Sequence, residues 1–323
     1  MTRARVILNP SSGRERGPDS AELLTARLGV RYDVVDISVT TGDGDAERAA
    51  VVALHDGCDA LFVAGGDGTL NEAMNGLASA GGIDALGIGI IPFGTGNDFA
   101  AALGIPPEAD AALDILLAGR EVRVDLGEVN GRVFVNTSGG GFIAEASTAV
   151  TPQLKTVAGR LAYLIGGAQA LMEFEPVEAA VQLGGGERID RALYVFAVCN
   201  SRLIGGGRLI APDAVLDDGL LDVCLIEAMS AMDLIGLARK VADGEHVADP
   251  RVIYRQAASV RIELARPVKV NTDGEVFEGQ RCEYRVRPRA ARFLAGDSPY
   301  TIARPVRPAA PPGDTSPRQT ANA

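Results

Sequence analysis

The sequence contains few of the residues on which several classes of site depend. It has no tryptophan and only two histidines, His55 and His246, neither of which has a histidine partner nearby. That scarcity argues against a histidine-based metal site or a catalytic triad. The four cysteines are far apart and show no C-x-x-C spacing, which argues against a structural zinc site. We therefore expect buried, reduced thiols in a cytoplasmic protein.

Basic charge and long apolar runs are also scarce. The formal net charge of −11 argues against general nucleic-acid binding, which needs a dense basic surface. Residues 1–5 lead into a strand of only a few apolar residues, without the long apolar region of a signal peptide. The longest apolar helical segment, around Leu161 to Met172, is too short to span a bilayer. Any contact with a membrane is therefore expected to be peripheral and transient.

The first part of the chain alternates between strand-like and helix-like segments. Strands are expected at Arg5–Leu8, Tyr32–Val39, Ala60–Ala64 and Leu86–Ile91, with helices such as Ser20–Leu28 and Asp45–His55 between them. This alternation predicts a parallel sheet with right-handed crossovers. The first domain is expected at residues 1–127, completed by residues 288–300.

From Asp125 onward the pattern changes to paired strands. Val260, Ile262 and Leu264 alternate with charged residues, which is typical of antiparallel strands that are buried on one face. The glycine-rich residues 138–142 are expected to form a turn. The fold class is therefore predicted as α/β, with a Rossmann-like parallel-sheet domain followed by an antiparallel β-sandwich domain at residues 128–287. Residues 304–323 are rich in proline and alanine and are expected to be disordered.

The stretch Val63–Glu72 (VAGGDGTLNE) joins a buried strand to a helix. Its glycines allow close approach of a ligand to the backbone, and the free amides and dipole of the helix N-terminus attract an anion such as a phosphate. Asp67 would repel that phosphate unless a divalent cation lies between them. The stretch therefore predicts a site for phosphate plus Mg²⁺, with Thr69 able to cap the helix and reach the same ligand.

Two further turns follow strands in the same way. Asn9-Pro10-Ser11-Ser12-Gly13 follows the first strand, and residues 92–99 (PFGTGNDF) follow the strand that ends near Ile91. Ligands of open α/β sheets bind beyond the carboxyl ends of the strands, so we expect both turns to lie beside the GGDGT loop. Taken alone, Asn97 or Asp98 could be an ordinary helix cap.

In this order, the NPSSG, GGDGTLNE and PFGTGNDF motifs resemble those of the diacylglycerol kinase catalytic domain family, whose relatives include sphingosine and ceramide kinases. The resemblance extends over residues 3 to 295. It implies a nucleotide domain like that of NAD kinases and phosphofructokinases, and direct Mg²⁺-assisted transfer of the ATP γ-phosphoryl group to a lipid hydroxyl. By position in the family motifs, the implied nucleotide-binding residues are Asn9, Pro10, Ser11, Ser12, Gly13, Thr40, Gly65, Gly66, Asp67, Gly68, Thr69, Leu70, Asn71, Glu72, Thr95, Asn97 and Asp98.

The resemblance also assigns roles in the second domain. The acidic loop APDAVLDDG could be a solvated turn, but the family holds Mg²⁺ there, which implies ligation by Asp218 and by the carbonyls of Val215 and Leu220. The Asp-Gly-Glu turn on its own predicts a hairpin. By position in the family, Glu275 is the first candidate for the base that accepts the hydroxyl proton, and Asp273 is the second.

One departure and several open points remain. The phosphate motifs contain no lysine or arginine, so charge must be neutralised by metal, helix dipoles or distant residues such as Arg14 or Arg16. The alternatives are an NAD kinase-type enzyme and a catalytically silent nucleotide-binding regulator. ATP and a lipid at the membrane surface are the expected partners, with no nucleic acid. The identity of the acceptor and the oligomeric state, with a homodimer as one option, stay open.

Overall fold

The computed structural model describes residues 1–12, 19–142, 144 and 175–297 of the chain. Four expectations fall outside these residues. They concern Gly13, the cations Arg14 and Arg16, the helix around Leu161 to Met172, and the tail at 304–323.

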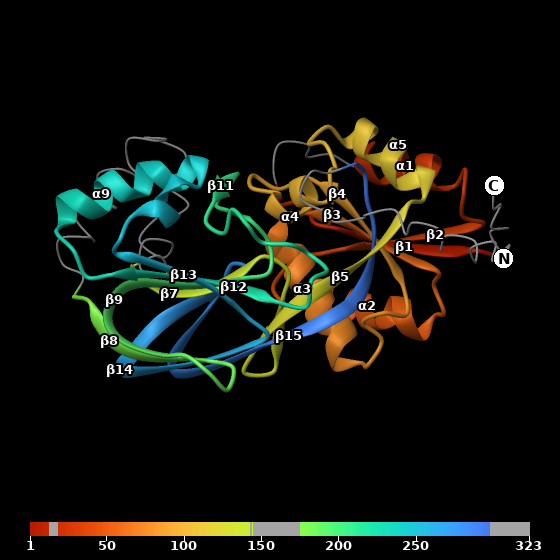
Figure 1. Cartoon of the computed structure of the whole chain (residues 1–323). Coiled ribbons are helices and arrows are strands. Elements are labelled where there is room, and N and C mark those ends of the chain that lie inside the picture. Colours follow the sequence, from red (N-terminus) through yellow and green to blue (C-terminus); the bar gives the residue numbers. More distant parts are fainter. Residues whose placement is uncertain (13–18, 143, 145–174, 298–323) are drawn as a thin grey trace, which may run out of the picture.

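The first half of the chain forms a parallel sheet with the order β4-β3-β1-β2. Its strands are β1 (Arg3–Leu8), β2 (Val34–Val39), β3 (Ala60–Gly65) and β4 (Gly87–Pro92). Its helices are α1 (Asp19–Leu28), α2 (Asp45–His55), α3 (Asp67–Ser79), α4 (Asp98–Ala102) and α5 (Ala109–Ala118). In Figure 1, α1 and α5 lie on one side of this sheet and α2 and α3 on the other. Because helices cover both faces, every residue of β3 and β4 is buried, which explains their continuous apolar runs.

The second half is built on antiparallel strands. The long strands are β5 (Glu121–Val129), β7 (Thr137–Gly141), β8 (Val177–Leu183), β9 (Arg188–Cys199), β12 (Leu221–Glu227), β13 (Val252–Ala257), β14 (Ser259–Thr272) and β15 (Glu275–Leu294). The short elements are β6 (Arg132–Phe134), β10 (Leu203–Ile204), β11 (Arg208–Leu209), α9 (Ala231–Lys240) and two 3₁₀ turns, Val241–Asp243 and Glu245–Ala248. An apolar core lies between β8, β9, β12, β14 and β15, and a second core lies under α9. The expected combination of a parallel α/β lobe and an antiparallel β-sandwich lobe is confirmed.

Strand β15 connects the two lobes. It begins as the partner of β14, pairs along its length with β5, and ends with Arg292 and Phe293 beside β4 in the parallel sheet. Figure 1 shows this blue strand running from the sandwich into the first lobe. The two lobes therefore share one continuous sheet. The residue limits given above for the two domains stay a prediction.

The glycine-rich segment after β6 is a strand, and the expectation of a turn at residues 138–142 was wrong over most of that segment. Thr137–Gly141 forms β7, which is hydrogen-bonded to β9 on one side and to β14 on the other. A Cβ on Gly140 would lie 2.3 Å from Cζ of Phe196. The glycines are therefore needed for close packing inside the sheet. In the sequence alone, a run of glycines that packs in this way looks the same as a run that forms a turn.

Candidate active site

Three turns meet at the carboxyl ends of β1, β3 and β4. The Asn9 amide donates to the Ala64 carbonyl at 2.9 Å, and Asn9 Nδ2 donates to Thr69 Oγ1 at 2.8 Å. The turns after β3 and β4 touch through their backbones, because a Cβ on Gly94 would lie 2.5 Å from Cα of Gly66. The NPSSG, GGDGT and PFGTGNDF motifs are thus side by side, in the arrangement expected from the sheet.

Helix α3 begins within the GGDGT motif and has no side-chain cap. The N-cap residue is Gly66, which has no side chain that could accept a hydrogen bond from the first-turn amides. The amides of the first helical turn therefore lack an intrahelical acceptor and remain able to bind an anion. The expectation that Thr69 caps the helix was wrong. The helix begins before Thr69, which lies in its first turn, is buried and accepts a hydrogen bond from Asn9.

The Asp67 carboxylate links α3 to α4 and to the second lobe. It accepts hydrogen bonds from the amides of Asp98 and Phe99, both at 3.1 Å, and from Asn136 Nδ2 at 3.2 Å. Asn97, the N-cap residue of α4, has a left-handed backbone and makes no cap bond of its own. Asp67 therefore supplies the cap of α4 from a distant part of the chain.

The Asp98 side chain also forms hydrogen bonds to the second lobe. Its carboxylate accepts hydrogen bonds from the amides of Gly206 and Gly207, the shortest at 2.7 Å, in the turn between β10 and β11. Burial raises the pKa of Asp98 above its usual value, although the two amides oppose this effect. The side chain therefore faces the second lobe.

The other predicted nucleotide-binding residues divide into two groups. Pro10, Ser11, Gly68 and Thr95 are exposed around the open side of the three turns, and Ser12 and Gly66 are partly exposed. Buried residues form the second group: Thr40, Gly65, Leu70 and Asn71.

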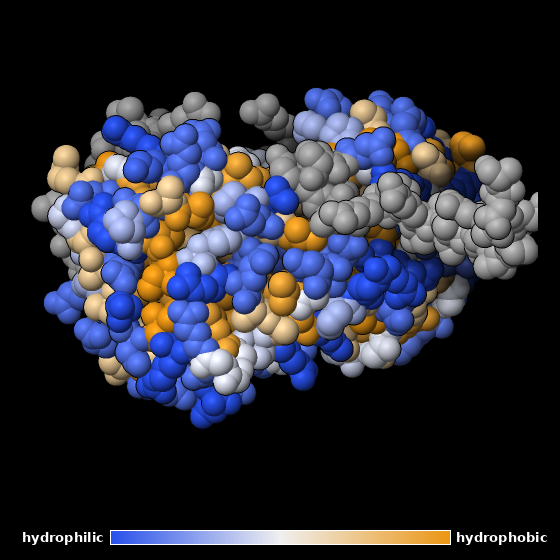
Figure 2. Space-filling model, in the orientation of Figure 1, coloured by the Kyte–Doolittle hydropathy of each residue, from blue (hydrophilic) through white to orange (hydrophobic). Residues whose placement is uncertain are grey.

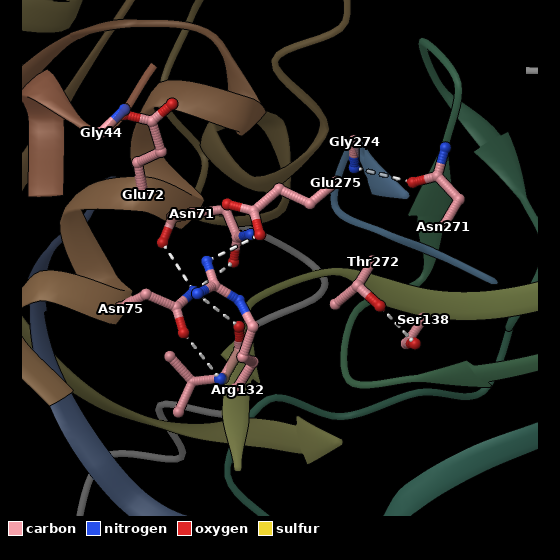
Figure 3. Close-up of polar contacts among 11 residues, drawn as sticks. Gly44, Asn71, Glu72, Asn75, Arg132, Ser138, Asn271, Thr272, Gly274 and Glu275 are labelled. Atoms are coloured by element: carbon pink, nitrogen blue, oxygen red, sulfur yellow. Dashed lines mark hydrogen bonds and ion pairs between the residues drawn. The ribbon is translucent and has the colours of Figure 1, made fainter. Parts of the chain in front are cut away.

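The Glu72 side chain is hydrogen-bonded to the start of another helix. Its Oε2 atom accepts a hydrogen bond from the Gly44 amide at 3.2 Å, at the start of α2 (Figure 3). Burial raises the pKa of Glu72, and the nearby charges of Asp43 and Glu275 act in the same direction.

The Asp-Gly-Glu motif forms the hairpin turn between β14 and β15, as its pattern indicates, with Asp273 and Gly274 at positive φ (48° and 102°). The Asp273 carboxylate accepts hydrogen bonds from three successive amides, those of residues 135, 136 and 137, at 2.6 to 3.2 Å. Burial raises its pKa to about 7. The turn lies against the phosphate loop, because a Cβ on Gly68 would be 4.0 Å from the Asp273 carbonyl oxygen.

Glu275 lies beside α3 and forms an ion pair with Arg132. Its Oε2 atom is 2.6 Å from Nη2 of Arg132, and both side chains are partly exposed. Figure 3 shows this pair next to Asn71 and Asn75 of α3. Glu275 is therefore the more accessible of the two predicted base candidates.

The predicted metal loop approaches β5. Asp218 Oδ1 accepts a hydrogen bond from the Leu220 amide at 2.9 Å, and the buried Asp125 accepts one from Gly219 at 2.7 Å. Burial raises the pKa of Asp218, and the Asp125 and Asp217 charges raise it further. Among the described residues, no three or more His, Cys, Asp or Glu side chains are placed to hold a metal ion together. A cation at this loop would depend on carbonyls such as those of Val215 and Leu220.

Asn136 is a site residue that sequence reasoning missed. Its side chain binds Asp67 while its own amide binds Asp273, so it joins the phosphate loop to the Asp-Gly-Glu turn. Its Oδ1 atom is buried without a hydrogen-bond partner among the described residues. The sequence signal is slight, because Asn136 simply follows the short apolar run Val133-Phe134-Val135.

Comparison with known proteins follows the same two-lobe division. Residues 3–129 match the model of the diacylglycerol kinase catalytic domain, and residues 137–295 match that of the YegS C-terminal NAD kinase beta sandwich-like domain. Among the described residues, no helix has the length and apolar character needed to cross a membrane.

The chain is also similar to two curated relatives and shares its fold with two solved structures. The chain is 37% identical to the diacylglycerol kinase of Bacillus subtilis (strain 168) over 277 residues, which cover 85% of this chain and 90% of that protein. It is 36% identical to the diacylglycerol kinase of Staphylococcus aureus (strain bovine RF122 / ET3-1) over 275 residues, or 84% and 86% of the two chains.

The crystal structure of a diacylglycerol kinase from Bacillus anthracis str. Sterne shares the fold, with a TM-score of 0.70 at 21% identity over 91% of this chain and 97% of that one. Yeast NADH kinase complexed with NADH is a more distant likeness of fold, with a TM-score of 0.51 at 11% identity over 92% and 84% of the two chains. From the sequence identity and coverage of the two relatives, the chain belongs to the diacylglycerol kinase family.

Proposed function

We propose that this protein is an ATP-dependent lipid kinase that transfers the γ-phosphoryl group of ATP directly to the hydroxyl of a diacylglycerol-like lipid. One observation carries the proposal. The uncapped first turn of α3 and the Asp-Gly-Glu turn come from different lobes and lie against each other at Gly68. A phosphate bound at the first would therefore lie beside the turn that carries Asp273 and Glu275.

The nucleotide phosphates would bind the amides of the first turn of α3. Gly66 and Gly94 keep the two phosphate turns in backbone contact, and Gly68 is exposed beside them. The single carboxylate Asp67 suits the Mg²⁺ ion that accompanies ATP, because Mg²⁺ in kinases is held by one or two carboxylates together with substrate phosphates. When bound, Mg²⁺ neutralises negative charge on those phosphates.

Glu275 is our choice for the base that accepts the proton of the lipid hydroxyl. Both oxygens of Asp273 already accept backbone hydrogen bonds, whereas Glu275, among the described residues, pairs with Arg132 and is partly exposed. In the reaction, the lipid oxygen bonds to the γ-phosphorus while the bond to the β–γ bridging oxygen breaks. The hydroxyl proton passes to the Glu275 carboxylate, and ADP leaves. Most of the catalysis then comes from positioning and charge stabilisation.

The acidic loop is proposed as a second Mg²⁺ site with a structural role. Asp218 and the carbonyls of Val215 and Leu220 are oxygen ligands, which a hard cation requires. The loop is bonded to Asp125 of β5, so an ion there would stabilise the position of the loop against β5.

The lipid acceptor implies peripheral, transient contact of a cytoplasmic enzyme with a membrane surface. In the view of Figure 2, apolar side chains gather in a band on the second lobe, below the region of α9. Such a surface on the sandwich lobe is compatible with a lipid-binding role. A homodimer is compatible with this proposal but is not required by it.

The proposal is tested by incubating the purified protein with γ-labelled ATP, Mg²⁺ and a total lipid extract, and identifying the labelled product by mass. The expected product is a phosphorylated diacylglycerol or a closely related lipid alcohol. Formation of NADP from NAD and ATP, without a lipid product, would identify an NAD kinase instead. ATP binding with no labelled product of either kind would favour a silent regulator and contradict the proposal.

A further inference from the structure

A row of polar contacts leads from helix α3 to Glu275. Asn75 lies two turns after the start of α3 and is buried. Its Nδ2 atom donates to the Val133 carbonyl and its Oδ1 atom accepts from the Val133 amide, both at 3.0 Å (Figure 3). The side chain therefore pairs with β6 as a neighbouring strand would. A displacement of β6 along α3 would break both bonds and leave buried polar groups unpaired.

Arg132 is the first residue of β6 and directly precedes Val133. It follows the tight turn between β5 and β6, in which Asn130 and Gly131 both have positive φ. Its guanidinium Nη2 lies 2.6 Å from Glu275 Oε2. The backbone of Arg132 is therefore held from one side by the tight turn and from the other by the bonds of Asn75 to Val133.

We propose that Arg132 is a positioning residue for phosphoryl transfer, which holds the Glu275 carboxylate at a set place relative to the first turn of α3. This inference rests on the proposed function, in which Glu275 is the base. A glutamate side chain has several rotatable bonds, and ordering it costs conformational entropy. The ion pair reduces that freedom before the substrate arrives.

A series of contacts connects Glu275 to the helix that would bind the nucleotide phosphates. Helix α3 carries the phosphate loop at its first turn and Asn75 further along the same rigid element. Asn75 holds β6, and β6 carries Arg132. Glu275 belongs to the other lobe, but these contacts hold it at a fixed place relative to α3, the helix that would bind the phosphates. Misplacement of a reacting group by about 1 Å can cost roughly 100-fold in rate.

An ordinary surface ion pair does not position a reacting group and contributes little to stability. The chain offers a matched example in Arg255 and Glu187, whose Nε and Oε2 atoms are 2.9 Å apart. Their side chains are 47% and 46% exposed, against 49% for Arg132 and 37% for Glu275. That pair joins β13 to the turn before β9, and it has no contact with the site. Arg255→Met is therefore the control for losing an arginine of this kind.

The experiment measures kcat and KM for the full chain with ATP, Mg²⁺ and diacylglycerol in mixed detergent micelles. We expect Arg132→Met to lower kcat about 10- to 100-fold while KM for ATP stays within about twofold of the parent value. Arg255→Met should leave both constants unchanged. Arg132→Lys should recover part of the lost kcat, because lysine keeps the charge but lacks the planar donor group of arginine.

A double variant separates positioning from an independent effect. If Arg132 acts through Glu275, the double variant Arg132→Met/Glu275→Gln should be no slower than Glu275→Gln alone. Multiplied losses in the double variant would overturn the inference, as would a kcat for Arg132→Met within twofold of the parent. A parent protein that phosphorylates no lipid would overturn the proposed function and this inference with it. An active parent with an unaffected Arg132→Met variant would overturn this inference alone.

Discussion

Replacing Asp67 by alanine should destabilise the protein as well as inactivate it. The carboxylate caps α4 through two amides and accepts a third hydrogen bond from Asn136. Loss of a helix cap costs about 0.5 to 2 kcal/mol. Loss of a hydrogen bond to a charged group costs about 1.5 to 3 kcal/mol. The sum lies at about 2 to 5 kcal/mol. Asp67→Asn keeps one acceptor oxygen and the shape of the side chain, so its cost should be about half as large.

The measurement is the free energy of unfolding in urea, followed by circular dichroism. Ser230→Ala is the control, because the Ser230 hydroxyl caps α9, far from the site, by accepting a hydrogen bond from the Asp233 amide and donating one to the Asp233 carboxylate. It should cost about 1 kcal/mol and leave turnover unchanged. An unfolding free energy for Asp67→Ala within about 0.5 kcal/mol of the parent, at the same slope against urea, would refute the capping role of Asp67.

Three further outcomes are expected. Gly94→Ala should abolish nucleotide binding, because its Cβ would meet backbone 2.5 Å away, whereas Gly42→Ala, with open space around it, should be neutral; equal affinities would contradict this. Glu275→Gln should lower kcat far more than ATP affinity, and loss of affinity alone would count against its role as base. Burial raises the pKa of Asp222 from 3.8 to about 6. Protonated Asp222 therefore contributes roughly 3 kcal/mol to the free energy of unfolding below pH 4. This contribution is lost as the pH rises through 6. Asp222→Asn should remove that slope in urea unfolding measured across the same pH range, and an unchanged slope would refute the cause.

The sequence predicted those parts of the site that are local in the chain. The GGDGT motif combines a strand, a glycine turn and a helix within ten residues, so its geometry follows from short-range rules. The parallel sheet then places the other two turns beside it without further information.

Contacts between the lobes were not predictable in the same way. Asn136 is 69 residues from Asp67, and Asp98 is 108 residues from Gly206. No spacing rule connects such pairs, and each residue alone resembles an ordinary turn or cap residue. The local prediction for Thr69 failed for a related reason, since its hydroxyl bonds to Asn9 of another turn.

The most direct test of the account is a crystal structure with a non-hydrolysable ATP analogue and Mg²⁺. The account expects the phosphates against the first-turn amides of α3, near Gly68, with the terminal phosphate facing Glu275. A nucleotide bound elsewhere, or phosphates directed away from the junction of the two lobes, would contradict it.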